Sequence, residues 1–396
     1  MIKRALIVLI ATLLTVCAPV GAQKVGLVLS GGGAKGMAHI GVIRALEENG
    51  IPIDYIAGTS MGAVIGSLYA MGYSPDEMQQ LISSDDFKNW YMGTRDMNYQ
   101  FYFKQNPPTP SIISAQVAIR DSMTVIRPTV NSLVDPLQMN LAFLDIFSGA
   151  SAACGNNFDN LFVPFRAVAS DVFNKNSIVL SKGALGDAVR ASMSFPFVFR
   201  PIMIDSIIAY DGGIYDNFPV DVMVNDFHPD FIIGSLVAVA PGEHKVEIPD
   251  EFDLMGQVTS MIIQKSDYSL DPSLGVKVEF DLTSVGLLGF HLIDEVSALG
   301  YRNTMLLMDS IKSRTTARRD TSVVQTRREE FKTRIPRLYF SDISVKGVNQ
   351  AQQRYIKKEL NAADNDFSFE DFKYGYFKLL SDDAISEIIP NTDFSP

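Results

Sequence analysis

Two apolar segments near the start of the chain, each followed by a glycine-containing turn and a helical pattern, constrain the fold most. The run KVGLVLS (24–30) is apolar without alternation, which is typical of a parallel strand covered on both faces. GGGAKG follows, and MAHIGVIRALEENG then has apolar residues at helical spacing, with Gly50 placed to end the helix. IPIDYIAGTSMGAVIGSLYAMG repeats the strand and the helix. This alternation predicts a parallel α/β sheet.

Four later apolar runs extend the same domain. They are FRAVAS (165–170), SIVLS (177–181), IIAYDGG (207–213) and FIIGSLVAVA (231–240). We therefore interpret residues 23–312 as one α/β domain. Residues 84–160 are less regular, contain the only tryptophan, Trp90, and include KQNPPTP, so we expect an insertion over one end of the sheet.

The first 22 residues have the pattern of a secretory signal. A positive start, MIKR, precedes the apolar stretch ALIVLIATLLTVCA, and PVGAQ offers small residues for cleavage after Ala22. A membrane anchor is the alternative, but a spanning helix needs roughly 20 apolar residues. Lipidation at Cys17 is a second alternative, although Val16 stands where a small residue is expected. We predict export to the periplasm, the outer membrane or the medium.

Charge and cysteine content exclude other classes. The chain has 34 basic and 45 acidic residues, a net charge of −11, so nucleic acid is not expected as a partner. Cleavage after Ala22 leaves only Cys154, which cannot form an internal disulfide and is expected to be buried.

The composition changes near the end of the α/β domain. Residues 313–336 are rich in lysine and arginine, and a solvated helix or linker is the expected structure. Residues 337–396 have the pattern strand, helix, helix, strand and are interpreted as a separate small module.

The glycine-rich loop allows two kinds of site. Gly31, Gly33 and Gly36 fit G-x-G-x-x-G between a strand and a helix, but the second strand ends in IAGTS without the acid that a dinucleotide site requires. A P-loop fails because Met37 follows Gly36. Consecutive glycines after a strand can instead present backbone amides to an oxyanion at a helix start. A plain tight turn remains the simpler alternative.

Ser60 lies in GTSMG, between an expected strand and an expected helix. A serine on such a turn holds a strained backbone and needs small neighbours, here Gly58 and Gly62, so that strand and helix can pass closely. A serine hydroxyl also needs a base. The candidate is Asp211, at the end of a predicted buried strand and followed by Gly212 and Gly213. Its reference pKa of about 3.9 must be raised by burial or adjusted by a hydroxyl partner for this role.

Histidine is an unpromising base in this chain. None of the four histidines stands late in the sequence in the Asp-then-His order of α/β-hydrolases. They are His39, His228, His244 and His291. His39 falls within the first helix, where a packed or capping role is expected.

Taken together, four motifs resemble the patatin-like phospholipase family. LSGGGAKGMAHIGVI, GTSMG, ASMSFPFVFRPI and YDGGIYDNFPV occur in the family's order, and the resemblance covers roughly residues 24–312. It implies a three-layer α/β/α fold with a mostly parallel sheet, and a Ser–Asp dyad without histidine, Ser60 as nucleophile and Asp211 as base. The implied oxyanion loop comprises Gly31, Gly32, Gly33 and Gly36, and the motif glycines are Gly58, Gly62, Gly212 and Gly213.

The resemblance also implies a substrate class. Phospholipid or lysophospholipid esters at a membrane surface are expected, with no cofactor and no metal ion. The C-terminal module, with LYFSDISVKGV, resembles part of a POTRA domain, which implies an outer-membrane context. Two alternatives stay open: a nucleotide-binding oxidoreductase, and a non-catalytic secretion or assembly component that carries a patatin fold.

Overall fold

The computed structural model describes most of the chain. The described residues are 23–94, 113–120, 123–130, 137–238, 266–360, 367–381, 385 and 388–392. The predicted signal peptide and the KQNPPTP segment lie outside them.

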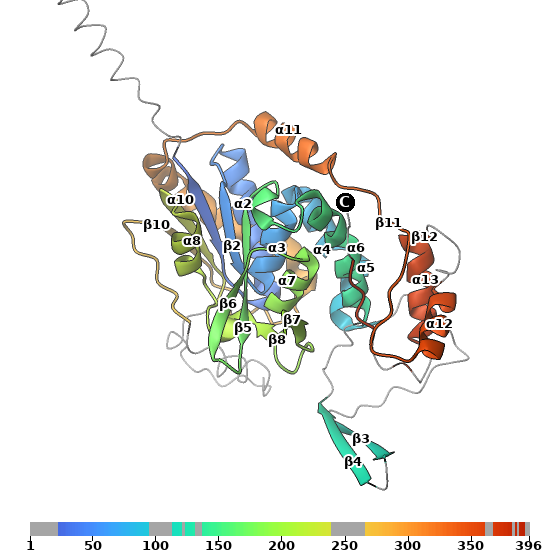
Figure 1. Cartoon of the computed structure of the whole chain (residues 1–396). Coiled ribbons are helices and arrows are strands. Elements are labelled where there is room, and N and C mark those ends of the chain that lie inside the picture. The colour runs from blue at the N-terminus through green and yellow to red at the C-terminus, as the bar shows by residue number, and fades with distance from the viewer. Residues whose placement is uncertain are drawn as a thin grey trace, which may run out of the picture.

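A mixed eight-stranded sheet forms the centre of the α/β domain, in the order β10-β9-β1-β2-β5-β8-β7, with β6 paired to β5 (Figure 1). The strands are β1 (Val25–Leu29), β2 (Tyr55–Thr59), β5 (Phe165–Asp171), β6 (Asn176–Leu180), β7 (Ile202–Ile204), β8 (Ile207–Asp211), β9 (Phe231–Leu236) and β10 (Gly275–Glu279). Strands β10, β9, β1, β2 and β5 are parallel, whereas β6, β7 and β8 are antiparallel additions. The six predicted strands are confirmed; β7 and β10 were not predicted.

Helices cover both faces of the sheet. They include α2 (Ala38–Glu48), α3 (Met61–Ala70), α4 (Pro75–Ile82), α5 (Asp85–Met92), α7 (Leu185–Ser192), α8 (Val220–Phe227) and α10 (Ile293–Arg314). Along β1, Leu27 and Leu29 belong to the main core with α2, α3 and α10, while Val28 packs on the opposite face with Met223 of α8. Burial on both faces explains the unbroken apolar run, and the predicted three-layer arrangement is confirmed.

The segment expected to be an insertion contains a core helix. Helix α6 (Leu137–Ala153) contributes Phe143, Phe147 and Ala150 to the main core, so the expectation for residues 84–160 was wrong for this part. Its only charged residue is Asp145, which is consistent with burial. Strands β3 (Ile113–Arg120) and β4 (Met123–Val130) form a separate antiparallel pair.

The basic segment is not a solvated linker throughout. Helix α11 (Thr321–Lys332) places Val324 and Phe331 in the main core and buries Arg328. The guanidinium of Arg328 forms an ion pair with Glu47 of α2. Because one stripe of α11 packs inward while its other charged side chains face solvent, composition alone gave the wrong expectation.

The C-terminal part differs from the predicted order of elements. It comprises β11 (Tyr339–Phe340), α12 (Gln350–Glu359), β12 (Phe367–Ser368) and α13 (Phe369–Leu379). The short strand β12 pairs with β11 and lies between the two helices in sequence. Leu141 and Leu144 of α6 share a hydrophobic cluster with Phe377 of α13. Within the described ranges, no helix has the length and apolar character needed to span a membrane.

Candidate active site

Strand pairing brings Ser60 and Asp211 together across 151 positions of sequence. Strand β2 pairs with β5 as far as Thr59 opposite Val168, and β8 pairs with β5 starting at Asp211 opposite Ala169. Because β6 occupies the other edge of β5, β2 and β8 share one edge, and their ends meet at consecutive residues of β5. Ser60 therefore follows β2 at the point where β8 ends.

The backbone at Ser60 has the conformation expected of a strained turn. Its φ is 54° and its ψ is −123°, a region that costs a non-glycine residue about 1–3 kcal/mol. A Cβ at Gly62 would lie 2.3 Å from the carbonyl oxygen of Leu29, and one at Gly58 would lie 2.5 Å from that of Gly62. Both motif glycines are therefore required by close backbone approach.

The hydroxyl of Ser60 donates a hydrogen bond to Asp211, with 2.6 Å between Oγ and Oδ2. The other oxygen of Asp211, Oδ1, accepts the Gly213 amide at 2.8 Å. Asp211 is 3% exposed, and its burial raises the pKa of the carboxyl to about 7, although the Ser60 and Gly213 hydrogen bonds act in the opposite direction. The carboxyl therefore has the proton affinity of a base that works near neutral pH.

Gly212 and Gly213 let the chain turn sharply after Asp211. A Cβ at Gly212 would lie 2.2 Å from the carbonyl oxygen of Val168, and one at Gly213 would lie 2.7 Å from Oδ1 of Asn217. A side chain at either position would displace the strand end that carries Asp211.

The glycine-rich loop contains two different kinds of glycine. The Gly31 amide donates to the carbonyl of Asn217 at 3.1 Å, and Gly36 lies inside the short 3₁₀ helix η1 (Gly33–Met37). Neither amide is therefore free to bind an oxyanion, so two of the four predicted oxyanion donors are excluded. The amides of Gly32 and Gly33 have no acceptor among the residues that the structure describes.

Gly31 and Gly36 instead provide space near Ser60. A Cβ at Gly31 would lie 3.0 Å from Cβ of Ser60, and one at Gly36 would lie 2.5 Å from Cγ of Met61. The loop can therefore pack directly against the turn that carries the serine.

The residues that hold this turn lie within the motifs ASMSFPFVFRPI and YDGGIYDNFPV, but the sequence assigned no role to them. The hydroxyl of Ser192 accepts the Ser60 amide, and the Ser194 carbonyl accepts the Asp211 amide. Asn217 anchors the glycine loop through its carbonyl and donates from Nδ2 to the Tyr268 hydroxyl at 3.1 Å. These contacts link distant segments, so no spacing within the sequence indicates them.

His39 is a structural residue. Its Nε2 lies 2.9 Å from the Ser30 carbonyl and its Nδ1 lies 2.7 Å from the Ser235 hydroxyl, so Nε2 donates and Nδ1 accepts. Burial lowers its pKa to about 4 and keeps the ring neutral. Among the described residues, no histidine forms a hydrogen bond with Ser60 or Asp211.

The acid nearest to a dinucleotide pattern also has another role. Asp54 precedes β2, at the end opposite Ser60, where it accepts the Val25 amide and pairs with Arg319 at 2.8 Å. The ribose partner that a nucleotide site would need is therefore absent from the described end of β2. Within the described ranges there is also no group of three or more histidine, cysteine or acidic side chains that could hold a metal ion.

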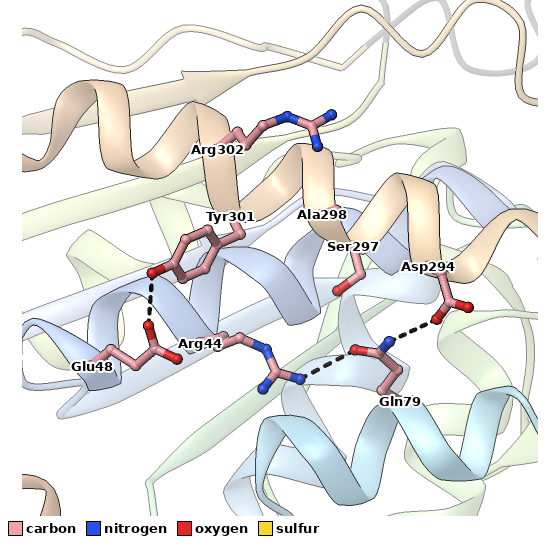
Figure 2. Close-up of a pocket in the computed structure, with 8 residues that line it drawn as sticks. All are labelled: Arg44, Glu48, Gln79, Asp294, Ser297, Ala298, Tyr301 and Arg302. Carbon is pink, nitrogen blue, oxygen red and sulfur yellow. Dashed lines mark hydrogen bonds between the residues drawn. The ribbon is translucent and has the colours of Figure 1, made fainter.

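A separate polar pocket of about 310 Å³ lies between α2, α4 and α10, and Figure 2 shows its lining. Arg44 donates to Gln79, Gln79 donates to Asp294, and Tyr301 donates to Glu48. Many of its polar groups thus satisfy one another. None of the predicted site residues lines it, so the Ser60–Asp211 pair remains the candidate site.

Comparison with known proteins identifies the family of the chain. A family model described as patatin-like phospholipase matches residues 27–224, half of the chain. An uncharacterised NTE family protein of Mycobacterium bovis is 32% identical over 50% of this chain and 44% of its own length. A lysophospholipase, NTE1, of Mycosarcoma maydis is 26% identical over 72% of this chain and 15% of its own length.

This chain therefore spans less than half the length of either relative. Among solved structures, VipD from Legionella pneumophila aligns with 86% of this chain and 75% of that protein, at 14% identity and a TM-score of 0.40. The family match includes the glycine-rich loop, Ser60 and Asp211. The chain belongs to the patatin-like phospholipase family.

Proposed function

We propose that this chain is a serine acyl hydrolase that cleaves phospholipid or lysophospholipid esters through a Ser60–Asp211 dyad. The observation that carries the proposal is the 2.6 Å hydrogen bond from Ser60 Oγ to a buried carboxylate whose pKa is raised to about 7. Family membership supports the reaction class, and a relative named as a lysophospholipase supports the substrate class.

In the proposed mechanism, Asp211 removes the Ser60 proton while Oγ attacks the ester carbonyl. The amides of Gly32 and Gly33, together with the positive end of the α3 dipole, stabilise the oxyanion. Collapse expels the alcohol, which takes the proton from Asp211, and leaves an acyl-serine. Asp211 then removes a proton from water and the resulting hydroxide attacks the acyl group. The bond to Ser60 Oγ breaks, Oγ takes the proton back from Asp211, and the fatty acid is released.

We also propose that the lipid surface lies at the end of the sheet where β2 leads into Ser60, that is, at the carboxyl ends of the parallel strands. Phe173 in the β5–β6 turn is 72% exposed and Met203 in the β7–β8 hairpin is 69% exposed. Both hairpin turns lie beyond the β5 residue that pairs with Thr59, the residue before Ser60. The strands β5, β6, β7 and β8 lie in the lower part of the α/β domain in Figure 1. Exposed apolar side chains around a hydrolytic site suit entry of lipid from a bilayer.

The cellular setting is proposed from sequence alone. The first 22 residues support export, and the partial POTRA resemblance of the C-terminal module supports a location at the outer membrane.

Lipid profiling tests the function directly. Purified protein is incubated with mixed phospholipid and lysophospholipid vesicles, and the products are compared with those of Ser60→Ala. The proposal predicts free fatty acid release that depends on Ser60. Absence of turnover by the native protein on every lipid would instead favour a non-catalytic assembly component.

A further inference from the structure

We propose that Ser192 is a positioning residue that holds the Ser60 turn in its reactive conformation. The proposal rests on the acyl-hydrolase function proposed above. Ser192 is the last residue of α7, is completely buried, and has no role in proton transfer in the proposed mechanism.

The Ser192 hydroxyl connects the sheet to the turn. It accepts the Ser60 amide at 2.9 Å and donates to the Val168 carbonyl at 2.5 Å. Val168 is the β5 residue opposite Thr59, the last residue of β2. The hydroxyl therefore ties the backbone of Ser60 to the strand on which the sheet register of the dyad depends.

This tether acts where the backbone is least favourable. Ser60 has a positive φ, and such a conformation persists only when its surroundings hold it. On the carbonyl side, the turn is held by Ala63 and Val64, whose amides donate to the Ser60 carbonyl at 2.9 and 3.1 Å. On the amide side, the hydroxyl of Ser192 is the partner.

The same helix end also holds the base. Two residues after Ser192, the Ser194 carbonyl accepts the Asp211 amide at 3.0 Å. The end of α7 and the two residues after it thus contact the backbone of both members of the dyad. Loss of the Ser192 hydroxyl frees the Ser60 turn while Asp211 keeps its own tether, so the predicted defect is one of alignment.

The test compares Ser192→Ala with the native protein on a soluble ester, with kcat expressed per folded molecule. We expect kcat to fall about 10- to 100-fold with KM unchanged, because a small misplacement of a reacting group has effects of this size. The midpoint of the pH profile should stay the same, since the contacts of the Asp211 carboxyl are intact. Ser67→Ala is the control, because Ser67 is a completely buried serine of α3 whose hydroxyl, within the described part of the chain, bonds only to Val64 of its own helix.

Each result is decisive. A Ser192→Ala variant with native kcat would overturn the inference, as would a loss that merely follows the folded fraction. A shifted pH midpoint would also overturn it, because Ser192 would then affect the pKa of Asp211 as well as the position of Ser60. An inactive native protein that fails to react at Ser60 would refute the proposed function itself, and with it this inference.

Discussion

Glu47 and Asp211 are both buried carboxylates of the α/β domain, but their surroundings differ. Glu47 lies under α11, where its Oε1 accepts the guanidinium of Arg328 and the hydroxyl of Tyr69. Asp211 has no cation partner among the described residues and accepts only the Ser60 hydroxyl and the Gly213 amide. A full counter-charge stabilises a buried carboxylate, whereas neutral donors leave it with a raised proton affinity.

The buried carboxylate of Glu47 has a structural role, whereas that of Asp211 is proposed to have a chemical one. The Glu47 region joins α11 to α2, and the ring of Tyr69 and that of Phe162 lie 5.7 and 5.5 Å from the Arg328 guanidinium. The Asp211 region leaves a carboxyl group able to exchange a proton near neutral pH. Disruption of the Glu47 ion pair should therefore lower stability and spare activity. Removal of the Asp211 carboxylate should lower activity and spare stability.

The largest expected effect is on activity at the dyad. Asp211→Asn should lower kcat/KM for a soluble ester at least about 10³-fold, because the amide cannot accept the Ser60 proton. Glu47→Gln should retain the native rate per folded molecule. Steady-state kinetics on both variants decide the matter, and an active Asp211→Asn protein would contradict the assignment of the base.

Next in size is the stability of the Glu47 region. Arg328→Met should lower the free energy of unfolding by about 3–5 kcal/mol, because it leaves the Glu47 carboxylate buried without its cation. Arg327→Met, at an exposed position on the same helix, should change it by less than about 1 kcal/mol. Chemical denaturation followed by circular dichroism measures both. Equal effects of the two substitutions would mean that α11 is not anchored through Arg328.

The third prediction concerns stability at the dyad. The folded carboxyl of Asp211 keeps its proton up to about pH 7, against an ordinary value of 3.8, so the native protein loses stability as pH rises between these values. Asp211→Asn removes this cost and should be more stable than the native protein at pH 8, by up to about 4 kcal/mol. The advantage should vanish near pH 4. Denaturation at both pH values provides the measurement, and a variant that is less stable at pH 8 would contradict the desolvation argument.

The pH profile gives a fourth test. Because the base must be unprotonated, kcat/KM should fall about tenfold for each pH unit below a midpoint near 7. The competing assignment is Asp216, whose pKa is also raised to about 7 by burial and by nearby Asp221. A midpoint that moves in Asp216→Asn would indicate that Asp216, and not Asp211, sets the pH dependence of kcat/KM.

The smallest expected effect is at the end of the sheet that is proposed to face lipid. Phe173→Ser should lower hydrolysis of phospholipid in vesicles about three- to tenfold, because it removes exposed apolar surface at the end of the sheet that carries the dyad, and leave soluble ester turnover unchanged. The control is Leu306→Ser, since Leu306 is 83% exposed on α10. Equal losses of vesicle hydrolysis in the two variants would mean that this end of the sheet has no special role in binding lipid.

Sequence predicted the regular part of the molecule well. The apolar runs at β1, β2, β5, β6, β8 and β9 identified strands, and the glycines around Ser60 identified a strained turn. Local patterns of this kind reflect burial on both strand faces and close backbone approach, which are properties of neighbouring residues.

The errors came from elements whose environment is set by distant residues. Val324, Arg328 and Phe331 have the spacing of a helix face, a signal that charge composition concealed in α11. The contacts of Ser192 with Ser60 and of Asn217 with Gly31 depend on tertiary folding, and no local pattern encodes them.

In the proposed mechanism the Ser60 hydroxyl reacts as a nucleophile activated by Asp211. Labelling with a fluorophosphonate at pH 8, followed by peptide mass spectrometry, measures this directly. A Ser60–Asp211 dyad should give one adduct, on the peptide that contains Ser60, and labelling should be at least about 100-fold slower in Asp211→Asn. An adduct on another residue, or equal labelling rates in the two proteins, would contradict it.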